Sequence, residues 1–320
     1  MLNRWSPRTI VAASSYLILN SLLSFSIINH FISCASQLCP DASFIYRSIE
    51  YKKLYKQNTK MADQRKARRE INQQLILSST ALTKSSKESV DSYLKRVTHL
   101  HMQNKRLCRI SGLDDCKNIK VLYLYDNQIE VIENLDFAAQ LQYLYLQNNQ
   151  IRDIPSLLMP NLTKLYLEEN EITFVSGLEQ CTKIQELYLA RQRLPMYSQL
   201  QFDYASLQAV SRTLQILDIS GNGITQMVPF TCLFNLRRLY CENNAIVDIA
   251  EIEAIIALDY LEEATFLGNP CALEMGNKYR DYTIGASSDA LIMLDHLPVL
   301  RHQQIAMRGL SAHRKKLGLY

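Results

Sequence analysis

Between residues 97 and 270 the chain repeats one arrangement of apolar and polar positions about every 22 residues. In 121-VLYLYDNQIEVI-132 and again in 143-YLYLQNNQIRDI-154, two leucines flank a tyrosine, an asparagine follows, and isoleucines close the unit. Successive side chains of a strand point to opposite faces, so the leucines should point into a core and the tyrosine out of it. The pattern predicts one short strand per unit, with a 3₁₀ or single-turn helix on the way back.

The consensus L-x-x-L-x-L-x-x-N-x-I-x-x-I is typical of leucine-rich repeats. No such unit folds alone, and stacking the units builds a parallel sheet whose buried asparagines satisfy backbone groups at the turns. We therefore expect an α/β solenoid: a leucine-rich repeat horseshoe of about eight repeats with a parallel concave sheet, 3₁₀ or short helices on the convex side, a helical N-cap and a C-terminal cap. The asparagine position is filled by Lys105, Asn127, Asn149, Asn170, Gln192, Asn222, Asn244 and Asn269.

The position between the two leucines should point out of the concave side, and five of its eight residues are tyrosine. Tyrosine suits a solvated strand, and stacked tyrosines support one another across neighbouring strands. Tyrosine is also enriched at interface hot spots, so the same column predicts a binding face, and the two interpretations are compatible. The column consists of His101, Tyr123, Tyr145, Tyr166, Tyr188, Asp218, Tyr240 and Thr265.

Charged positions beside this column make the predicted groove net acidic, which favours a partner with a basic surface. The acidic residues are Asp126, Glu168, Glu169, Glu186, Glu242 and Glu263, against Lys164, Arg191 and Arg238. The residues predicted to bind the partner are Tyr123, Asp126, Tyr145, Tyr166, Glu168, Tyr188, Tyr240 and Glu242.

Four segments are expected: an apolar segment followed by a basic linker (1–60), a basic segment with an N-capping helix (61–96), the repeat domain with its cap (97–300) and a basic tail (301–320). Ser85 and Glu88 form a potential capping box before an apolar helical pattern. The fifth unit carries eight extra residues within 191–213, where Ala205 to Val210 is predicted to be helical. This insert should project from the convex side or from one rim.

The net charge of +4 conceals an uneven distribution. Residues 1–96 carry 15 basic and 6 acidic side chains (+9), residues 97–300 carry 15 and 25 (−10), and residues 301–320 carry 5 and 0 (+5). An acidic body argues against a nucleic-acid-binding core, because phosphate contacts need clustered lysine and arginine. The basic ends could still contact acidic surfaces.

The stretch 10-IVAASSYLILNSLLSFSIINHFI-32 is long enough to span a bilayer, and Arg4 and Arg8 precede it. It can be a signal peptide or membrane anchor, a soluble apolar tail, or the product of an alternative or spurious upstream exon with translation starting at Met61. A late start or a soluble tail predicts a cytoplasmic protein, whereas a genuine apolar segment would allow a membrane location.

The motifs of common catalytic sites are absent: the sequence contains no G-x-x-x-x-G-K-[ST], no H-E-x-x-H and no G-x-S-x-G. His99 and His101 share one strand face, but no third ligand is spaced to complete a metal site. The eight cysteines include no C-x-x-C pair, which favours a reduced protein over a disulfide framework. We expect no enzyme activity, no cofactor and no bound metal.

The 22-residue units, the terminal 268-GNPC-271 segment with Tyr279-Arg280 and the acidic concave face resemble the leucine-rich regulatory subunits of protein phosphatase 1. The insert 192-QRLP-195 with Phe202-Asp203, and 214-TLQILDISGNGI-225, add to the resemblance, which covers roughly Tyr93 to His296. It implies a non-enzymatic subunit that docks the phosphatase catalytic subunit at centrosomes, microtubules or cilia. The docking motif basic-x-Val-x-aromatic departs from that family, because 95-KRVTH-99 lacks the aromatic and 171-EITF-174 lacks the base.

Two other functional hypotheses stay open. A cytoskeletal or axonemal adaptor would share the fold and bind tubulin or dynein subunits. A membrane-anchored leucine-rich receptor would require residues 10–32 to be a genuine membrane segment.

Overall fold

The computed structural model describes residues 70–317, and residues 1–69 and 318–320 lie outside the described part. The chain divides into two units, Met1–Ala67 and Arg68–Tyr320, and the second contains the repeats. The apolar segment 10–32 and the alternative start at Met61 therefore fall outside the described residues. The proposed segment boundaries stay predictions.

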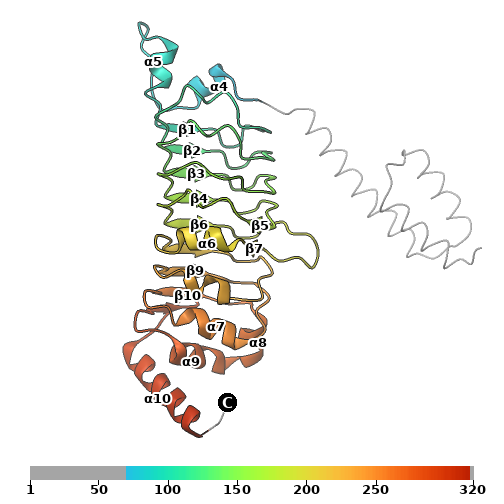
Figure 1. The fold of residues 1–320 in the computed structure, drawn as a ribbon, viewed down its shortest axis with the longest axis vertical. Coiled ribbons are helices and arrows are strands. Elements are labelled where there is room, and N and C mark those ends of the chain that lie inside the picture. Colours follow the sequence, from blue (N-terminus) through green and yellow to red (C-terminus); the bar gives the residue numbers. More distant parts are fainter. Residues whose placement is uncertain (1–69, 318–320) are drawn as a thin grey trace, which may run out of the picture. The chain divides into compact units, whose positions relative to one another are not determined.

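One ten-stranded sheet runs through the second unit, and each predicted repeat contributes one parallel strand to it (Figure 1). Neighbouring strands pair in a constant register, so equivalent residues of successive repeats lie side by side. The sheet ends in β11 (Met293–Leu294), which is parallel to β10, and β12 (Leu297–Pro298), which is antiparallel to β11. The eight-repeat solenoid expected from the sequence is confirmed. Its strands are β1 (His99–His101), β2 (Val121–Tyr123), β3 (Tyr143–Tyr145), β4 (Lys164–Tyr166), β6 (Glu186–Tyr188), β8 (Ile216–Asp218), β9 (Arg238–Tyr240) and β10 (Glu263–Thr265).

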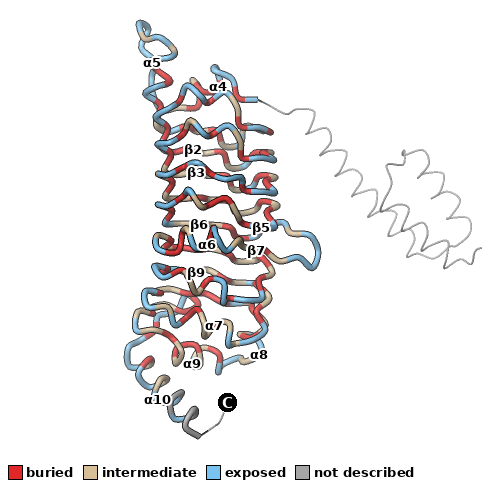
Figure 2. The backbone as a smooth tube through the Cα atoms, in the orientation of Figure 1, coloured by how far each residue is buried: buried red, intermediate tan, exposed pale blue. Residues whose placement is uncertain are grey.

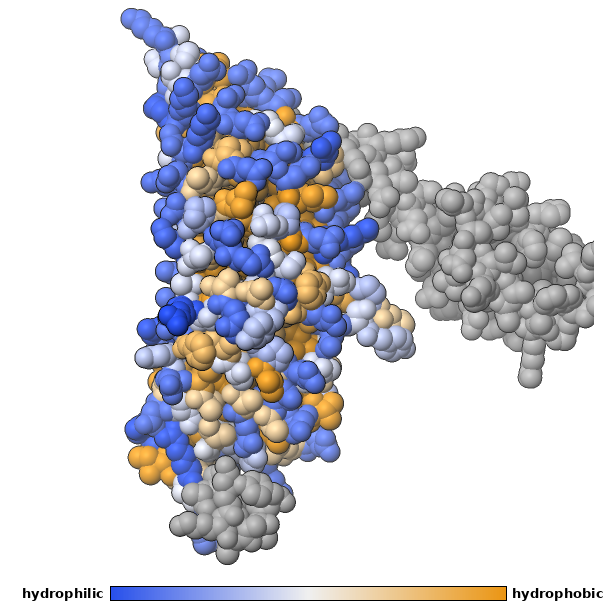
Figure 3. Space-filling view, in the orientation of Figure 1, coloured by the Kyte–Doolittle hydropathy of each residue, from blue (hydrophilic) through white to orange (hydrophobic). Residues whose placement is uncertain are grey.

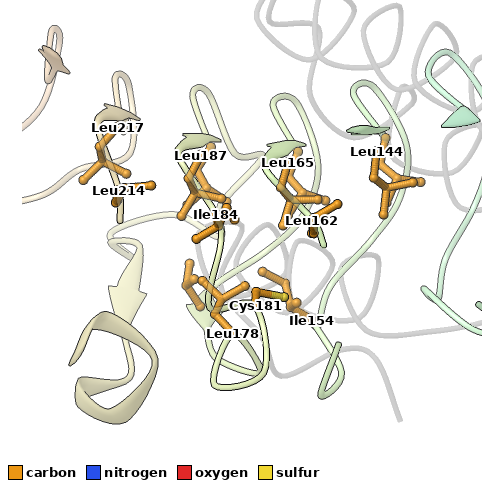
Figure 4. Close-up of a cluster of buried hydrophobic side chains, with 14 of the residues drawn as sticks. Leu144, Ile154, Leu162, Leu165, Leu178, Cys181, Ile184, Leu187, Leu214 and Leu217 are labelled. Carbon is orange, nitrogen blue, oxygen red and sulfur yellow. The ribbon is translucent and has the colours of Figure 1, made fainter. Parts of the chain in front are cut away.

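The core consists of columns of equivalent side chains stacked from repeat to repeat. Figure 2 shows the buried residues recurring in each successive repeat. Leu144, Leu165 and Leu217 are each fully buried behind the sheet, and Leu187 is 1% exposed. Figure 4 shows these leucines aligned beneath their strands, with Ile154, Leu178 and Cys181 closing the core further from the sheet. Each unit thus covers the apolar surface of its neighbours, which is why a single repeat could not remain folded alone.

A ladder of buried amide side chains ties each repeat to the one before it. The Asn170 Nδ2 atom donates to the backbone oxygens of Leu146, one repeat back, and of Leu167, in its own repeat, at 3.0 and 2.9 Å. Its Oδ1 atom accepts the Ile151 N–H at 3.1 Å. Gln192, whose side chain is longer by one methylene, makes the equivalent bonds: Nε2 donates to the backbone oxygens of Leu167 and Leu189, and Oε1 accepts the Ile172 N–H. We call these side chains the amide ladder: Asn127, Asn149, Asn170, Gln192, Asn222, Asn244 and Asn269.

The first repeat lacks this amide, since Lys105 is only partly buried there and its backbone N–H donates to Asn127 Oδ1 at 3.0 Å. The residue before the ladder position has a positive φ in all eight repeats. Glycine, asparagine and aspartate accept that conformation most easily, and they fill six of the eight positions. At Gly268 a Cβ would lie 2.2 Å from Asn243 Oδ1, so a larger residue there would also require the Asn243 side chain to move. Those eight residues are Asn104, Asp126, Asn148, Glu169, Arg191, Gly221, Asn243 and Gly268.

The convex side changes character along the chain. The early repeats return through turns alone, whereas the later ones carry short helices, so the predicted 3₁₀ or single-turn helices occur only in part of the solenoid. The predicted helix in the insert is present as α6. The helices are α4 (Gln73–Ser78), α5 (Val90–Leu94), α6 (Tyr204–Val210), η1 (Val228–Cys232), α7 (Ile249–Ile256), α8 (Pro270–Met275), α9 (Asn277–Ala286) and α10 (Arg301–Leu317).

The N-terminal cap differs from its prediction in one detail. Helix α5 begins at Val90, and its N-cap is Ser89, whose side chain accepts the Ser92 N–H at 3.1 Å. Ser85 and Glu88 form a turn ahead of the helix instead. The edge of β1 is also covered by an element that the sequence did not predict, because the backbone oxygen of Ser79, just after α4, accepts the His101 N–H at 2.8 Å.

The C-terminal cap buries one residue that was expected to be on the outer surface. Thr265 is fully buried because β11 extends the sheet beyond it, and the Asp295 N–H donates to the backbone oxygen of Ala264 at 2.9 Å. Asp295 Oδ1 accepts the Phe266 N–H at 2.7 Å, where the equivalent N–H groups of the repeats donate to a backbone oxygen of the next strand. The tyrosine column therefore ends at Tyr240.

We expect Asn170→Asp to destabilise the protein by roughly 3 kcal/mol or more at neutral pH. The change preserves shape but removes both Nδ2 donors and places a charge among buried carbonyl oxygens. Asn118→Asp removes one exposed hydrogen bond, to the Lys95 oxygen, and should cost far less. Urea denaturation of both variants checks the difference, and equal midpoints would contradict a structural role for the ladder.

Candidate functional site: an aromatic and acidic sheet face

The face of the sheet that points away from the core, called the concave face here, carries three columns of side chains. The central column is the predicted tyrosine position. Each column runs across adjacent strands in the observed register. The column before it consists of His99, Val121, Tyr143, Lys164, Glu186, Ile216, Arg238 and Glu263, and the column after it of Gln103, Tyr125, Gln147, Glu168, Ala190, Ser220, Glu242 and Leu267.

Five rings of the central column form one continuous stack. Successive ring centroids are 4.4 to 4.7 Å apart and the ring planes lie within 19° of parallel. This spacing matches the distance between neighbouring strands, so the sheet itself holds the rings face to face. The tyrosine stack, as we call it, consists of His101, Tyr123, Tyr145, Tyr166 and Tyr188.

Polar contacts fix the C-terminal end of the stack. Glu186 accepts hydrogen bonds from the Tyr188 hydroxyl at 3.2 Å and the Tyr166 hydroxyl at 3.4 Å, and pairs with Lys164 at 2.9 Å. The Lys164 ammonium also lies 5.3 Å from the centre of the Tyr143 ring. Burial raises the pKa of both stacked hydroxyls, and neighbouring phenols and Glu186 raise it further. The hydroxyls therefore stay protonated and act as donors.

Asp218 interrupts the column between Tyr188 and Tyr240. Burial raises the pKa of its carboxyl. The hydrogen bond from the Ser220 N–H to Oδ1, at 3.0 Å, opposes part of that increase. Glu168 lies close by, and burial with help from the Asp218 charge raises its pKa to about 7. The Oε2 atom of Glu168 is buried without a hydrogen-bond partner among the described residues. The charge of Arg191 lowers the pKa of both carboxyls in part, but Arg191 forms its ion pair with Glu169, so neither Asp218 nor Glu168 has an ion-pair partner of its own among the described residues.

The structure brings most of the predicted site residues together and separates one of them, Asp126, from the face. Five tyrosines and Glu168 lie on the concave face as expected. Asp126 instead lies at the turn that borders the face, where it accepts a hydrogen bond from Asn148 Nδ2 at 2.8 Å. Glu242 belongs to the face, but its Oε1 is 2.6 Å from His296 Nε2 of the C-terminal cap. Sequence reasoning did not predict that contact, because no repeat pattern specifies the cap.

The insert forms a second feature that the sequence predicted only as a bulge. It projects on the side opposite the ten-stranded sheet, next to the small parallel sheet of β5 (Phe174–Val175) and β7 (Gln201–Phe202) (Figure 1). An open cleft of about 740 Å³ lies between the insert and the turns of the next repeats. Figure 3 shows mainly pale, weakly polar or weakly apolar side chains on the projecting loop. The cleft lining includes Phe174, Tyr197, Gln199, Gln201, Gly223 and Thr225.

The sequence matches the family described as Leucine Rich repeats (2 copies) over residues 117–159, and that described as Leucine Rich repeat over residues 210–226. The chain contains leucine-rich repeats and has a leucine-rich repeat fold. Its fold is similar to that of internalin C2 from Listeria monocytogenes, with 21% sequence identity and a TM-score of 0.50 over 62% of this chain and 83% of the internalin. At that identity the likeness concerns the fold alone.

Two further structures are similar to this leucine-rich repeat chain. An internalin F from Listeria monocytogenes is 23% identical over 65% of this chain and 64% of its own, with a TM-score of 0.48. A leucine-rich repeat protein from Leptospira interrogans is 21% identical, and the match covers 61% of this chain and 45% of the Leptospira protein, with a TM-score of 0.46.

The leucine-rich repeat fold is typically a scaffold for protein–protein interaction. Among residues 70–317, no three His, Cys, Asp or Glu side chains are grouped so that they could hold a metal ion. Within the same range, no helix is both long and apolar enough to cross a membrane.

We expect Glu168→Gln to stabilise the protein at pH 8 by about 1–3 kcal/mol. The folded-state pKa of about 7 lies above the ordinary value of 4.5, so the folded protein binds the proton more tightly than the unfolded chain. Stability from this group is therefore present at low pH and is lost as the pH rises from 4.5 through 7. The stability of Glu168→Gln relative to the wild type should therefore increase between pH 4.5 and about 7 and then level off.

Chemical denaturation midpoints at pH 4.5, 6 and 8 provide the measurement. Glu274→Gln, at an exposed position of α8, is the matched control and should show no such growth. A Glu168→Gln curve parallel to the wild type across the whole range would contradict the prediction.

Proposed function

We propose that this chain is a non-enzymatic scaffold whose concave face docks the catalytic subunit of protein phosphatase 1 at centrosome and microtubule structures. The observation that carries the proposal is the tyrosine stack on a face with more carboxyl than basic side chains. Its rings are partly exposed although each one contacts its neighbours.

A stacked ring has little rotamer freedom left to lose when a partner covers it. Side-chain ordering is one of the main costs of association, so a face that is already ordered binds more tightly for the same buried area. Tyrosine also combines an apolar ring with a hydroxyl that can bond across an interface. These properties favour a protein partner over a small molecule on this broad, shallow surface.

The charge of the face selects the kind of partner. The three columns carry five carboxylates (Glu168, Glu186, Asp218, Glu242 and Glu263) and two basic side chains (Lys164 and Arg238). Such a surface attracts a basic partner surface and repels an acidic one. Within the leucine-rich regulatory subunits of protein phosphatase 1, the quoted repeat and insert sequences most resemble regulatory subunit 42, the testis leucine-rich repeat protein. That resemblance supports the choice of partner and the cytoskeletal location.

The departure from the short phosphatase-docking motif supports docking through the repeats rather than through a linear peptide. The nearest match, 95-KRVTH-99, ends in a histidine on β1, and Val97 is fully buried. A buried valine cannot enter a pocket of another protein, so this segment is a poor docking peptide in the folded chain.

A cytoskeletal adaptor that binds tubulin or dynein is the second candidate. It is favoured by the same net acidic, aromatic face, because nothing in that chemistry is particular to a phosphatase. A membrane-anchored receptor depends on residues 10–32, which lie outside the described part of the chain.

We expect the double variant Tyr145→Ala and Tyr166→Ala to weaken binding of the phosphatase catalytic subunit at least tenfold. The two changes remove the centre of the stack without touching the core, so circular dichroism should stay unchanged. Binding would be measured by titration calorimetry with purified catalytic subunit.

The control is Tyr204→Ala with Tyr260→Ala, because both tyrosines are exposed and lie off the sheet, at 71% and 55% exposure. Unchanged affinity of the Tyr145/Tyr166 variant, with the fold intact, would reject docking through this face. Absence of phosphatase binding by the wild type, together with co-sedimentation with microtubules, would favour the adaptor instead.

A further inference from the structure

We infer that the break in the tyrosine stack at Asp218 is a slot for one arginine side chain of a protein partner. The inference deepens the proposed function, since it rests on the concave face being a protein-binding surface. It is carried by three observations: the register of the strands, the chemistry at the bottom of the gap, and the absence, among residues 70–317, of a cation stacked on either flanking ring.

The width of the gap follows from the sheet. Tyr188, Asp218 and Tyr240 are direct neighbours on β6, β8 and β9. Strands lie about 4.8 Å apart, so the positions of Tyr188 and Tyr240 are separated by about 9.6 Å across the short Asp218 side chain. Elsewhere in the stack one ring fits between two others at 4.4 to 4.7 Å from each. The gap thus has the thickness of one planar group.

The chemistry inside the gap suits a planar cation. Asp218 forms no ion pair with any described residue, and the Glu168 Oε2 atom nearby has no hydrogen-bond partner. Ala190, between Glu168 and Ser220 in the following column, adds no polar group of its own. A guanidinium is flat, always charged and carries five donors, so it can stack on tyrosine faces and bond a carboxylate at the same time.

The cations already present do not occupy this position. Arg191 bonds Glu169 at 3.0 Å with Nη2 and at 3.2 Å with Nε, at the border of the face. Arg238 is exposed and lies beside the Tyr240 hydroxyl, and its charge also lowers the pKa of the Tyr188 hydroxyl. Within residues 70–317 the cation–ring contacts are made by Arg96 and Lys164, on Tyr93 and Tyr143. Arg238 therefore acts on the hydroxyls of the two rings that flank Asp218, and no described cation is stacked on either ring.

Two substitutions separate the contributions of charge and space. Asp218→Asn keeps the gap and removes the carboxylate charge. Asp218→Tyr closes the gap by adding the ring that the other repeats carry, and tyrosine is favourable on a solvated strand. Asp126→Asn is the matched control, because this carboxylate borders the same face but lies outside the gap.

The experiment is an NMR titration of the full chain, labelled with ¹³C in its tyrosine rings, with N-acetylarginine methylamide. We expect saturable upfield shifts of the Tyr188 and Tyr240 ring signals, assigned through Tyr188→Phe and Tyr240→Phe. The neutral analogue N-acetylcitrulline methylamide should bind at least tenfold more weakly, and so should the arginine compound to both Asp218 variants. Asp126→Asn should bind like the wild type.

Equal binding of the citrulline compound, or unchanged binding to Asp218→Asn, would overturn the inference. Equal binding of N-acetyllysine methylamide would also overturn it, because a point charge needs no planar slot. The outcome is separable from the proposed partner. Arginine binding with no phosphatase capture rejects the phosphatase alone, whereas phosphatase capture with no arginine binding rejects the slot alone.

Discussion

The amide ladder is the interaction on which the rest of this molecule depends. Each ladder side chain bonds the backbone of two repeats, and a backbone oxygen such as that of Leu146 accepts from two successive ladder amides, Asn149 and Asn170. The bonds fix the register of each repeat against its neighbour. Because that register is constant, equivalent residues lie side by side in every column: leucines pack on leucines in the core, and rings stack on rings on the outer face of the sheet. Gln192 shows that the requirement is for an amide at a fixed place rather than for asparagine.

The tyrosine stack follows from the same constraint. A parallel sheet places equivalent residues one strand apart, and that distance is close to the preferred separation of stacked rings. The repeat therefore turns a single choice of residue into an extended aromatic surface. Asp218 has a large effect for the same reason, since one exception in a regular column creates a gap of defined size between two ordered rings.

The sequence predicted the periodic features well because each is repeated many times. Leucines, ladder amides and outward tyrosines appear in unit after unit, so the eight strands and the face that each residue occupies could be assigned from spacing alone. Features that occur once could not be assigned in this way. The burial of Thr265 depends on β11, the N-cap moved from Ser85 to Ser89, and the cleft at the insert depends on how a single irregular loop folds back.

The constant ring spacing also limits how long a rigid partner can follow the face. Rings recur every 4.4 to 4.7 Å. The turns of an α-helix recur about every 5.4 Å, and the like-facing side chains of a strand about every 6.7 Å. A helix laid along the stack would drift by about one ring position within seven of its turns, and a strand within three of its like-facing residues. A straight helix can therefore be in phase with the five stacked rings at only one place, whereas a strand comes back into phase after about three rings.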